Sequence, residues 1–138
     1  LGYRTQRLTY TLALRIRGYI RKGMPSYQAF LKVQTHLIAL GKAYSEDIAY
    51  AAFRRQVETM EADGFRNLFD KLGTLHALNV LSRDASWYMQ QGYFGKNKSK
   101  AVQRRVERLC SELRPHVGDL VEGFGIPKSL IRKVPICN

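Results

Sequence analysis

Apolar residues recur at steps of three and four through the last third of this 138-residue chain, and this spacing is typical of one face of an α-helix. Pro115 lies in the middle of the run. In a continuous helix its ring clashes with the carbonyl of Ser111, which costs about 3 kcal/mol. The spacing continues past Pro115, so we predict either one helix kinked near Arg114 or two successive helices that turn the same face to one core. The residues in phase are Val102, Val106, Leu109, Leu113, Val117, Leu120 and Phe124.

The start of the chain fits two patterns. Between Thr9 and Gly18, apolar and polar residues alternate, which is the period of a β-strand. A second set of apolar residues fits a helix instead, and Gly23 and Pro25, which follow it, are common helix stop signals. We therefore predict a helix over residues 3–22. The residues at helical spacing are Leu8, Leu12, Ile16 and Tyr19.

The middle of the chain predicts two further long helices. The first begins at Ser26, a good N-cap residue, and ends near Met60, and we expect Gly41 inside it to allow another helix to approach closely or to mark a local break. Its apolar positions are Phe30, Leu37, Gly41, Tyr44, Ile48 and Ala52. After a turn at residues 61–64, the second runs from Phe65 to near Gly92 with a broad apolar face that predicts deep burial. That face contains Leu68, Phe69, Leu72, Leu75, Leu78, Leu81, Ala85 and Tyr88.

The last long helix is expected from Lys98 onward, after a loop containing Gly92 and Gly95. Gly123 and Gly125 can end the helical region, and a short turn is expected over residues 128–132. The predicted fold class is therefore all-α, a helical bundle of about four long helices with the last one kinked near Pro115. With 45% apolar residues, the 138 residues are expected to form one domain. An uninterrupted apolar run of about 18 residues does not occur, so no membrane span is predicted.

Residues that commonly carry chemistry are sparse and scattered. Cys110 and Cys137 are too few for a disulfide framework, and the three histidines, at positions 36, 76 and 116, lie 40 residues apart, so no metal site is predicted. Acid/base chemistry in this stretch would have to use Glu112, His116, Asp119 or Glu122. Asp119 and Glu122 share a helix face, and we expect these two to pair with cations instead. The residues themselves predict no catalytic or cofactor-binding site.

The strongest compositional signal is the charge, with 23 Lys and Arg against 11 Asp and Glu and a net charge of +12. Residues 1–45 contain eight basic residues and no acid, and a third basic cluster lies in the tail at Lys128, Arg132 and Lys133. Such clusters attract phosphates of nucleic acids or nucleotide cofactors, anionic lipid surfaces or an acidic neighbouring domain, or are simply solvated. The second basic cluster, our candidate phosphate-binding or domain-contact patch, consists of Lys96, Lys98, Lys100, Arg104, Arg105 and Arg108.

Three stretches resemble the C-terminal helical domain of acyl-CoA oxidases, in order and spacing, across nearly the whole chain. They are YRTQRL (Tyr3–Leu8), LHALNVLSRDASWYMQQGY (Leu75–Tyr93) and LCSELRPHVGDLVEGFGIPKSLIRKVPI (Leu109–Ile136). The third is the most specific. The chain departs from the family pattern at His76, Ser82, Gly123 and Lys128, which puts partner contacts in doubt more than membership.

The resemblance implies a parent flavoenzyme that oxidises fatty acyl-CoA to trans-2-enoyl-CoA in fatty acid β-oxidation and passes electrons from reduced FAD to oxygen, giving hydrogen peroxide. The catalytic glutamate of that family, and most residues that hold FAD and acyl-CoA, lie upstream of the region matched here. No catalytic residue is therefore carried onto this chain. The resemblance further implies that the domain packs on upstream acyl-CoA dehydrogenase-like domains and that the parent is a homodimer. In that setting a basic cluster is expected to face a cofactor, the CoA head group or an acidic neighbouring domain.

Two alternatives stay open at this point. One is a stand-alone basic helical module that binds nucleic acid or another anionic partner, which is disfavoured because the cations are spread over several helices and the aromatic residues have core-like spacing. Those aromatic residues are Tyr27, Phe30, Phe65 and Trp87. The other is a scaffold or interaction domain without enzymatic context. Because the sequence opens with Leu1 rather than methionine, we expect a part of a longer protein. The resemblance implies a peroxisomal location for a eukaryotic source and a cytoplasmic one for a bacterial source, although residues 135–138 do not spell a Ser-Lys-Leu signal.

Overall fold

The computed structural model describes residues 1–127 and residue 130, and every regular element in that part of the chain is helical. The prediction of an all-α protein with four long helices is thereby confirmed. The elements in order are α1 (Gly2–Arg21), α2 (Ser26–Leu31), α3 (Gln34–Glu58), α4 (Gly64–Arg83), α5 (Ala85–Gln90), α6 (Lys96–Leu113), a 3₁₀ turn η1 (Arg114–His116) and α7 (Val117–Glu122). Among the helices of the described part, none is long and apolar enough to cross a lipid bilayer.

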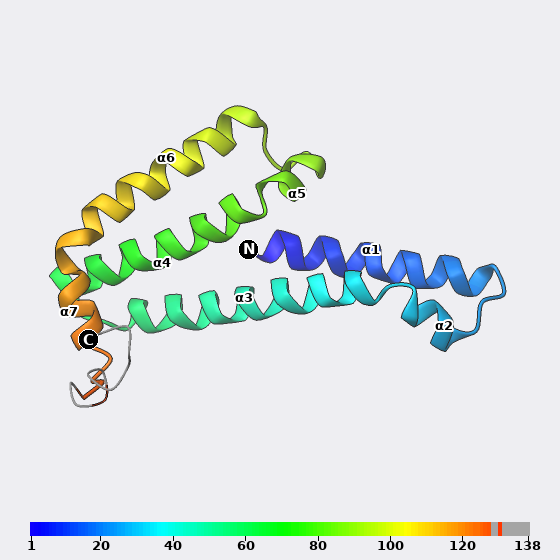
Figure 1. Cartoon of the computed structure of the whole chain (residues 1–138), viewed down its shortest axis with the longest axis horizontal. Helices are drawn as coiled ribbons and strands as arrows, with labels where there is room; N and C mark the ends of the chain where they lie inside the picture. Colours follow the sequence, from blue (N-terminus) through cyan, green and yellow to red (C-terminus); the bar gives the residue numbers. More distant parts are fainter. Residues whose placement is uncertain (128–129, 131–138) are drawn as a thin grey trace.

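Helix α3 is the spine of the molecule, about 37 Å long from its 25 residues. Helix α1 runs antiparallel along the first half of α3, and α4 runs antiparallel along the second half, on the same side (Figure 1). His36 of α3 contacts α1 at Thr11, while Phe53 of α3 contacts α4 at Gly73. The start of α1 and the end of α4 therefore meet end to end over the middle of α3.

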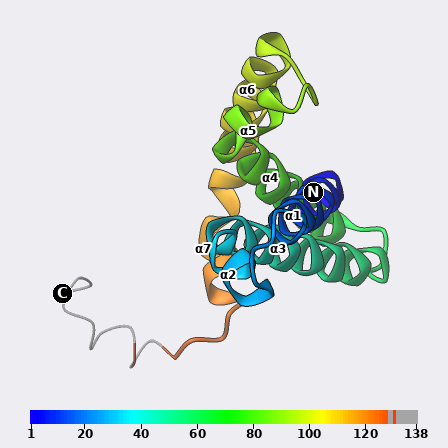
Figure 2. The ribbon, with the colours of Figure 1, turned by 90° about the vertical axis from the view of Figure 1, so that its right-hand side faces the viewer.

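Helix α6 packs along α4 and so extends the arrangement away from α3. Leu109 and Leu113 of α6 are buried, and an ion pair of 3.0 Å joins Lys71 of α4 to Glu112 of α6. In Figure 2, α6, α4 and the α1/α3 pair follow one another in a row. Each long helix thus packs mainly on the neighbours that chain connectivity places beside it, and the described helices form an open layer.

The accessible surface confirms that this layer is open. The chain exposes 10229 Å², whereas a compact monomer of 15.9 kDa exposes about 7,400 Å². Ten residues are not described, and ten residues of fully unfolded chain would expose about 1,700 Å². This area is smaller than the excess. Our expectation of a bundle closed around one interior is therefore wrong for the described residues, because a single layer of helices can bury only the sides that touch.

The outer stripe of α3 is a specific correction. We expected the apolar positions from Leu37 to Ala52 to face the core, but the face of α3 that contacts α1 and α4 carries Ala43 and Val57 instead. The predicted stripe lies on the opposite side of the helix, where Tyr44 and Ile48 are about half exposed. A Cβ atom on Gly41 would have no atom of another described element within 4 Å, so none of the described helices approaches this residue closely. Helix α3 thus has two apolar faces, of which this chain covers one.

Two predicted helices are interrupted. The helix expected from Ser26 to Met60 breaks at residues 32–33, where Val33 has a non-helical backbone and tucks its side chain inside at 3% exposure. The helix expected from Phe65 to near Gly92 breaks at Asp84, where α5 begins. The broad face of α4 is mostly half-buried rather than deeply buried, since only Gly73 and Val80 are fully enclosed.

The proline region was half correctly predicted. The α-helix does end beside Pro115, which lies in η1, and α7 follows. The apolar positions after Pro115, however, are not buried as we expected. Leu109 and Leu113 are buried, whereas Val117 is 50% exposed and Phe124 is 78% exposed. The 3₁₀ turn has fewer residues per turn than an α-helix, so it shifts the phase of the apolar positions that follow it. The turn expected at residues 128–132 lies largely outside the described residues.

We expect alanine substitutions at two glycines in the long helices to have opposite effects on stability. A Cβ on Gly73 would lie 2.8 Å from the Cε1 atom of Phe53, whose ring also packs on Phe69, so Gly73→Ala must displace that ring. Overpacking of this kind costs about 1–3 kcal/mol. Gly41 is exposed and open, so Gly41→Ala should stabilise α3 by up to about 1 kcal/mol through helix propensity. Chemical denaturation of both variants measures the difference, and equal stabilisation by both would contradict the close α3–α4 contact.

Candidate functional site

Four charged side chains meet where α1, α3, α4 and α5 come together, and we name Arg4, Glu46, Arg83 and Asp84 the junction cluster. Arg4 donates to the carboxylate of Asp84, although the two residues lie 80 positions apart. Arg83 donates through Nη2 to Asp84 (3.0 Å) and to Oε1 of Glu46 (2.6 Å). The Arg4 residue is only 8% exposed. The cluster therefore joins the end of α4 to the start of α1 and both to the middle of α3.

An aromatic group surrounds the inner side of this cluster. Tyr3 stacks on Tyr93 with ring centres 4.4 Å apart, and the guanidinium carbon of Arg4 lies 5.5 Å from the ring centre of Trp87. Tyr88, only 1% exposed, packs against Trp87. Burial raises the pKa of the Tyr88 phenol, an effect that the nearby positive charge of Arg4 opposes. We therefore interpret Tyr88 and Arg4 as structural residues that hold the helix ends together.

The sequence contains a signal for the junction cluster that the spacing of apolar residues alone did not reveal. Arg4 lies one turn before Leu8 and two before Leu12, on the same face of α1, and all three are buried. A charged residue in phase with an apolar stripe requires a buried partner, because an unpaired buried charge is very costly. The first two resemblance stretches, Tyr3–Leu8 and Leu75–Tyr93, meet at this point.

The second basic cluster lies where it was predicted, on α6, with all six side chains exposed. Lys96, Lys100, Arg104 and Arg108 are four residues apart and form a row on the outer face, opposite the buried Leu109. Like charges at this spacing oppose helix formation by a few tenths of a kcal/mol per pair. The Arg105 side chain lies 3.6 Å from Glu112. Exposure and alignment are thus findings of the structure, and the binding role remains a prediction.

Of the acidic residues near the last helix, Glu112 is held by cations. Glu112 bonds to Lys71 at 3.0 Å and also faces Arg105, and these cations hold the pKa of its carboxyl below the ordinary value. The pairing with cations that we expected for Asp119 and Glu122 stays a prediction. His116 and Asp119 line the same shallow hollow of about 290 Å³. Within residues 1–127, His, Cys, Asp and Glu side chains do not gather in any group of three that could hold a metal ion.

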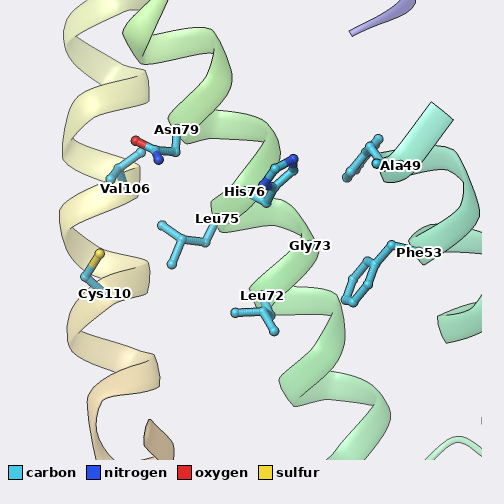
Figure 3. A pocket seen from close by; sticks show the side chains of 10 residues that line it. Ala49, Phe53, Leu72, Gly73, Leu75, His76, Asn79, Val106 and Cys110 are labelled. Atoms are coloured by element: carbon cyan, nitrogen blue, oxygen red, sulfur yellow. The ribbon is translucent and has the colours of Figure 1, made fainter. Parts of the chain in front are cut away.

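An apolar groove of about 580 Å³ lies along α4, between α3 and α6, and the sequence pattern did not predict it (Figure 3). Val106 and Cys110 reach it from α6, and Ala49 and Phe53 reach it from α3. The groove exists because the layer is open at α4. Its walls contain neither Lys nor Arg.

Comparison with known proteins identifies the class to which this fold and its junction cluster belong. A model of the acyl-CoA oxidase family matches residues 1–132, and the chain therefore belongs to that family. It is 26% identical over 130 residues to the peroxisomal acyl-coenzyme A oxidase 2 of Arabidopsis thaliana, covering 94% of this chain and 19% of that protein. Identity is 29% over 115 residues both to the peroxisomal acyl-coenzyme A oxidase 3 and to a putative acyl-coenzyme A oxidase of the same plant.

These matches cover 82% of this chain, with 17% of oxidase 3 and 61% of the putative oxidase. The chain thus spans about a fifth of the length of the two named peroxisomal oxidases. Comparison with solved structures gave no match.

We expect removal of the two arginines of the junction cluster to lower the free energy of unfolding by different amounts. Arg4→Met leaves Asp84, whose side chain is 17% exposed, with one cation instead of two, and breaking a buried pair costs about 3 kcal/mol or more. Arg83→Met removes a guanidinium whose side chain is 45% exposed, and such pairs contribute about 1 kcal/mol or less. Urea denaturation of both variants measures the costs. A loss for Arg83→Met as large as for Arg4→Met would contradict the larger contribution that we assign to the buried Arg4.

Proposed function

We propose that this chain is the C-terminal helical domain of a flavoprotein that oxidises fatty acyl-CoA to trans-2-enoyl-CoA and reduces oxygen to hydrogen peroxide. The observation that carries the proposal is the family match over residues 1–132. Its support in the structure is that the first two resemblance stretches converge in the junction cluster, which sets the relation between α1 and α4. Since two relatives are named as peroxisomal oxidases, we extend the proposal to a peroxisomal location and to fatty acid β-oxidation.

Neither the apolar groove along α4 nor the second basic cluster fits FAD by itself. FAD carries a pyrophosphate that needs cationic or amide donors beside an apolar slot for its rings. The apolar groove along α4 has the volume but no Lys or Arg in its walls, and the second basic cluster lies on a convex outer face. We therefore assign FAD and acyl-CoA binding mainly to chain upstream of the matched region, and no step of the reaction to residues described here.

Contact with that upstream chain is the role we propose for this domain. The outer stripe of α3 supports it, because Tyr44 and Ile48 are about half exposed and Ile38 is 72% exposed on a helix that is paired only on its other side. Exposed apolar area of this extent commonly marks a contact surface. A helix of the upstream domain, or of a second subunit in a homodimer, is the partner we propose for the stripe.

The experiment that tests the function measures hydrogen peroxide formation by a protein containing this domain and its upstream region, with a fatty acyl-CoA as substrate. We expect bound flavin, substrate-dependent bleaching of its absorbance, and peroxide in proportion to enoyl-CoA. A protein that binds flavin but gives enoyl-CoA without peroxide would belong to another reaction class and would contradict the proposal.

Charge reversal of the second basic cluster tests its proposed role in the same protein. The variant Lys98→Glu, Lys100→Glu, Arg104→Glu changes the local charge by six units and should weaken flavin retention, acyl-CoA affinity or assembly, because each partner carries anionic groups. Flavin absorbance after gel filtration, the KM for acyl-CoA and the elution volume are the three measurements.

A matched control reverses an equal number of exposed cations on and just after α1, namely Arg17, Arg21 and Lys22. If the α6 variant behaves like the unmodified protein in all three measurements, or if the control loses as much, the assigned role of the second basic cluster is wrong.

Nucleic-acid binding is the alternative function, and one observation favours it. The aromatic residues expected in the core are exposed at Tyr27 (73%) and Phe65 (64%), which removes one argument against it. They lie on α2 and α4, however, and not beside the row of cations on α6. Association with single-stranded or duplex DNA that weakens steeply with salt, together with absence of flavin, would favour this alternative over the oxidase.

A further inference from the structure

A second groove lies between α1, α3 and α5, and we name it the α1–α5 groove. Its volume is about 590 Å³, within the range of small-molecule sites, and its lining residues include two arginines, one histidine and two glutamines but no Asp or Glu. On a domain with a net charge of +12, a concave site without acids concentrates positive potential. The groove is separate from both the second basic cluster on α6 and the apolar groove along α4.

Arg7 is held at the wall of this groove. Its Nε donates to Oε1 of Gln91 at 3.0 Å, and its guanidinium carbon lies 5.9 Å from the ring centre of Tyr10. Among the described residues, no carboxylate pairs with Arg7, so its terminal N–H groups stay available. A guanidinium fixed at one edge presents a planar pair of donors, which matches the oxygens of a phosphate.

His36 is held at the opposite wall. Its Nε2 lies 3.0 Å from the carbonyl oxygen of Leu8, which can only accept, so Nε2 carries a hydrogen. The hydroxyl of Thr11 lies 3.1 Å from the same nitrogen and bonds to the carbonyl of Arg7 at 2.9 Å. The ring is thereby oriented, and its Nδ1, which has no hydrogen-bond partner among the described residues, can accept the hydrogen of a singly protonated phosphate. Thr11, which contacts His36, lies one helical turn after Arg7 on α1. Arg7 and His36 are therefore at positions about 6 Å apart along the helix axis.

We propose that the α1–α5 groove binds a small molecule bearing a phosphate group, with the phosphate between Arg7 and His36. Arg15 also lines the groove, two turns after Arg7 on α1 and about 12 Å from it along the helix axis. Its positive charge attracts the same anion. Leu8, Ala39 and Trp87 provide apolar wall for the body of the ligand, and Gln90 offers an amide. This proposal does not depend on the proposed oxidase function, because it uses only side chains of this chain.

A small phosphate ester fits the groove better than a nucleic acid does. A nucleic-acid strand needs a row of cations along its path, whereas the groove has one oriented arginine and one histidine at a single level. A carboxylate shares the anionic chemistry but offers two oxygens in one plane, where a phosphate offers three that can reach both walls. The test therefore includes both kinds of anion.

The experiment titrates the protein with adenosine 5′-monophosphate, inorganic phosphate, adenosine and acetate, and follows the Nε–Hε signal of Arg7 by NMR. We expect saturable shifts with the monophosphate and with inorganic phosphate in the millimolar range or tighter, and none with adenosine or acetate. Arg7→Gln should weaken phosphate binding at least about tenfold, as loss of a charge-assisted pair does; for that variant, binding is followed at the ring signals of His36.

Two further variants keep the test independent of folding. Gln91→Glu places a carboxylate beside Arg7 and should abolish phosphate binding while the helix content stays unchanged by circular dichroism. Arg17→Gln removes the same charge from a position of α1 outside the groove and should leave binding intact. Equal losses in Arg7→Gln and Arg17→Gln, equal binding of acetate, or no saturable shift with either phosphate would each overturn the proposal.

Discussion

The structure depends on an ionic contact between two helix ends. The start of α1 and the end of α4 share one side of α3 without overlapping, so no long apolar interface connects them. The Arg4–Asp84 pair closes this gap, and Arg83 carries the contact to Glu46 on α3. Apolar contacts tolerate sliding, whereas a buried guanidinium satisfies a carboxylate in few orientations. The junction cluster therefore sets both the axial position and the rotation of α1 against α4.

The open layer suits a chain whose named relatives are much longer than itself. One face of α3, the groove along α4 and the apolar side of α7 are exposed, although their composition is that of buried surface. An ordinary domain of this size would fold these surfaces against one another. Here the end-to-end placement of α1 and α4 prevents closure, because each covers only half of the spine. The surfaces that remain open are those at which, in our proposal, a neighbouring domain completes the burial.

The sequence predicted what depends on local spacing. The four long helices, the stop after residue 22 and the interruption beside Pro115 follow from periodicity and from the backbone limits of proline and glycine. Spacing cannot choose between two apolar faces of one helix, which is why the stripe of Tyr44 and Ile48 was assigned to the wrong side. Of the candidate site, the residues of the second basic cluster were identified from the sequence, whereas their exposure and their alignment on α6 come from the structure. The junction cluster and the α1–α5 groove were not identified from the sequence, since both combine side chains about 80 residues apart.

The spine arrangement also divides the cooperativity of the chain. Helices α4 and α6 form one antiparallel hairpin, and α1 forms another with the first half of α3, so most apolar contacts lie within a hairpin. The junction cluster, the contacts of Tyr3 with Trp87 and Tyr93, the Arg7–Gln91 hydrogen bond and the continuity of α3 couple the two. Opening of α1 would consequently release Arg4 without disturbing Leu109 or Leu113 in the other hairpin. The α1/α3 hairpin and the α4/α6 hairpin are thus two units that can unfold separately, and the junction cluster joins them.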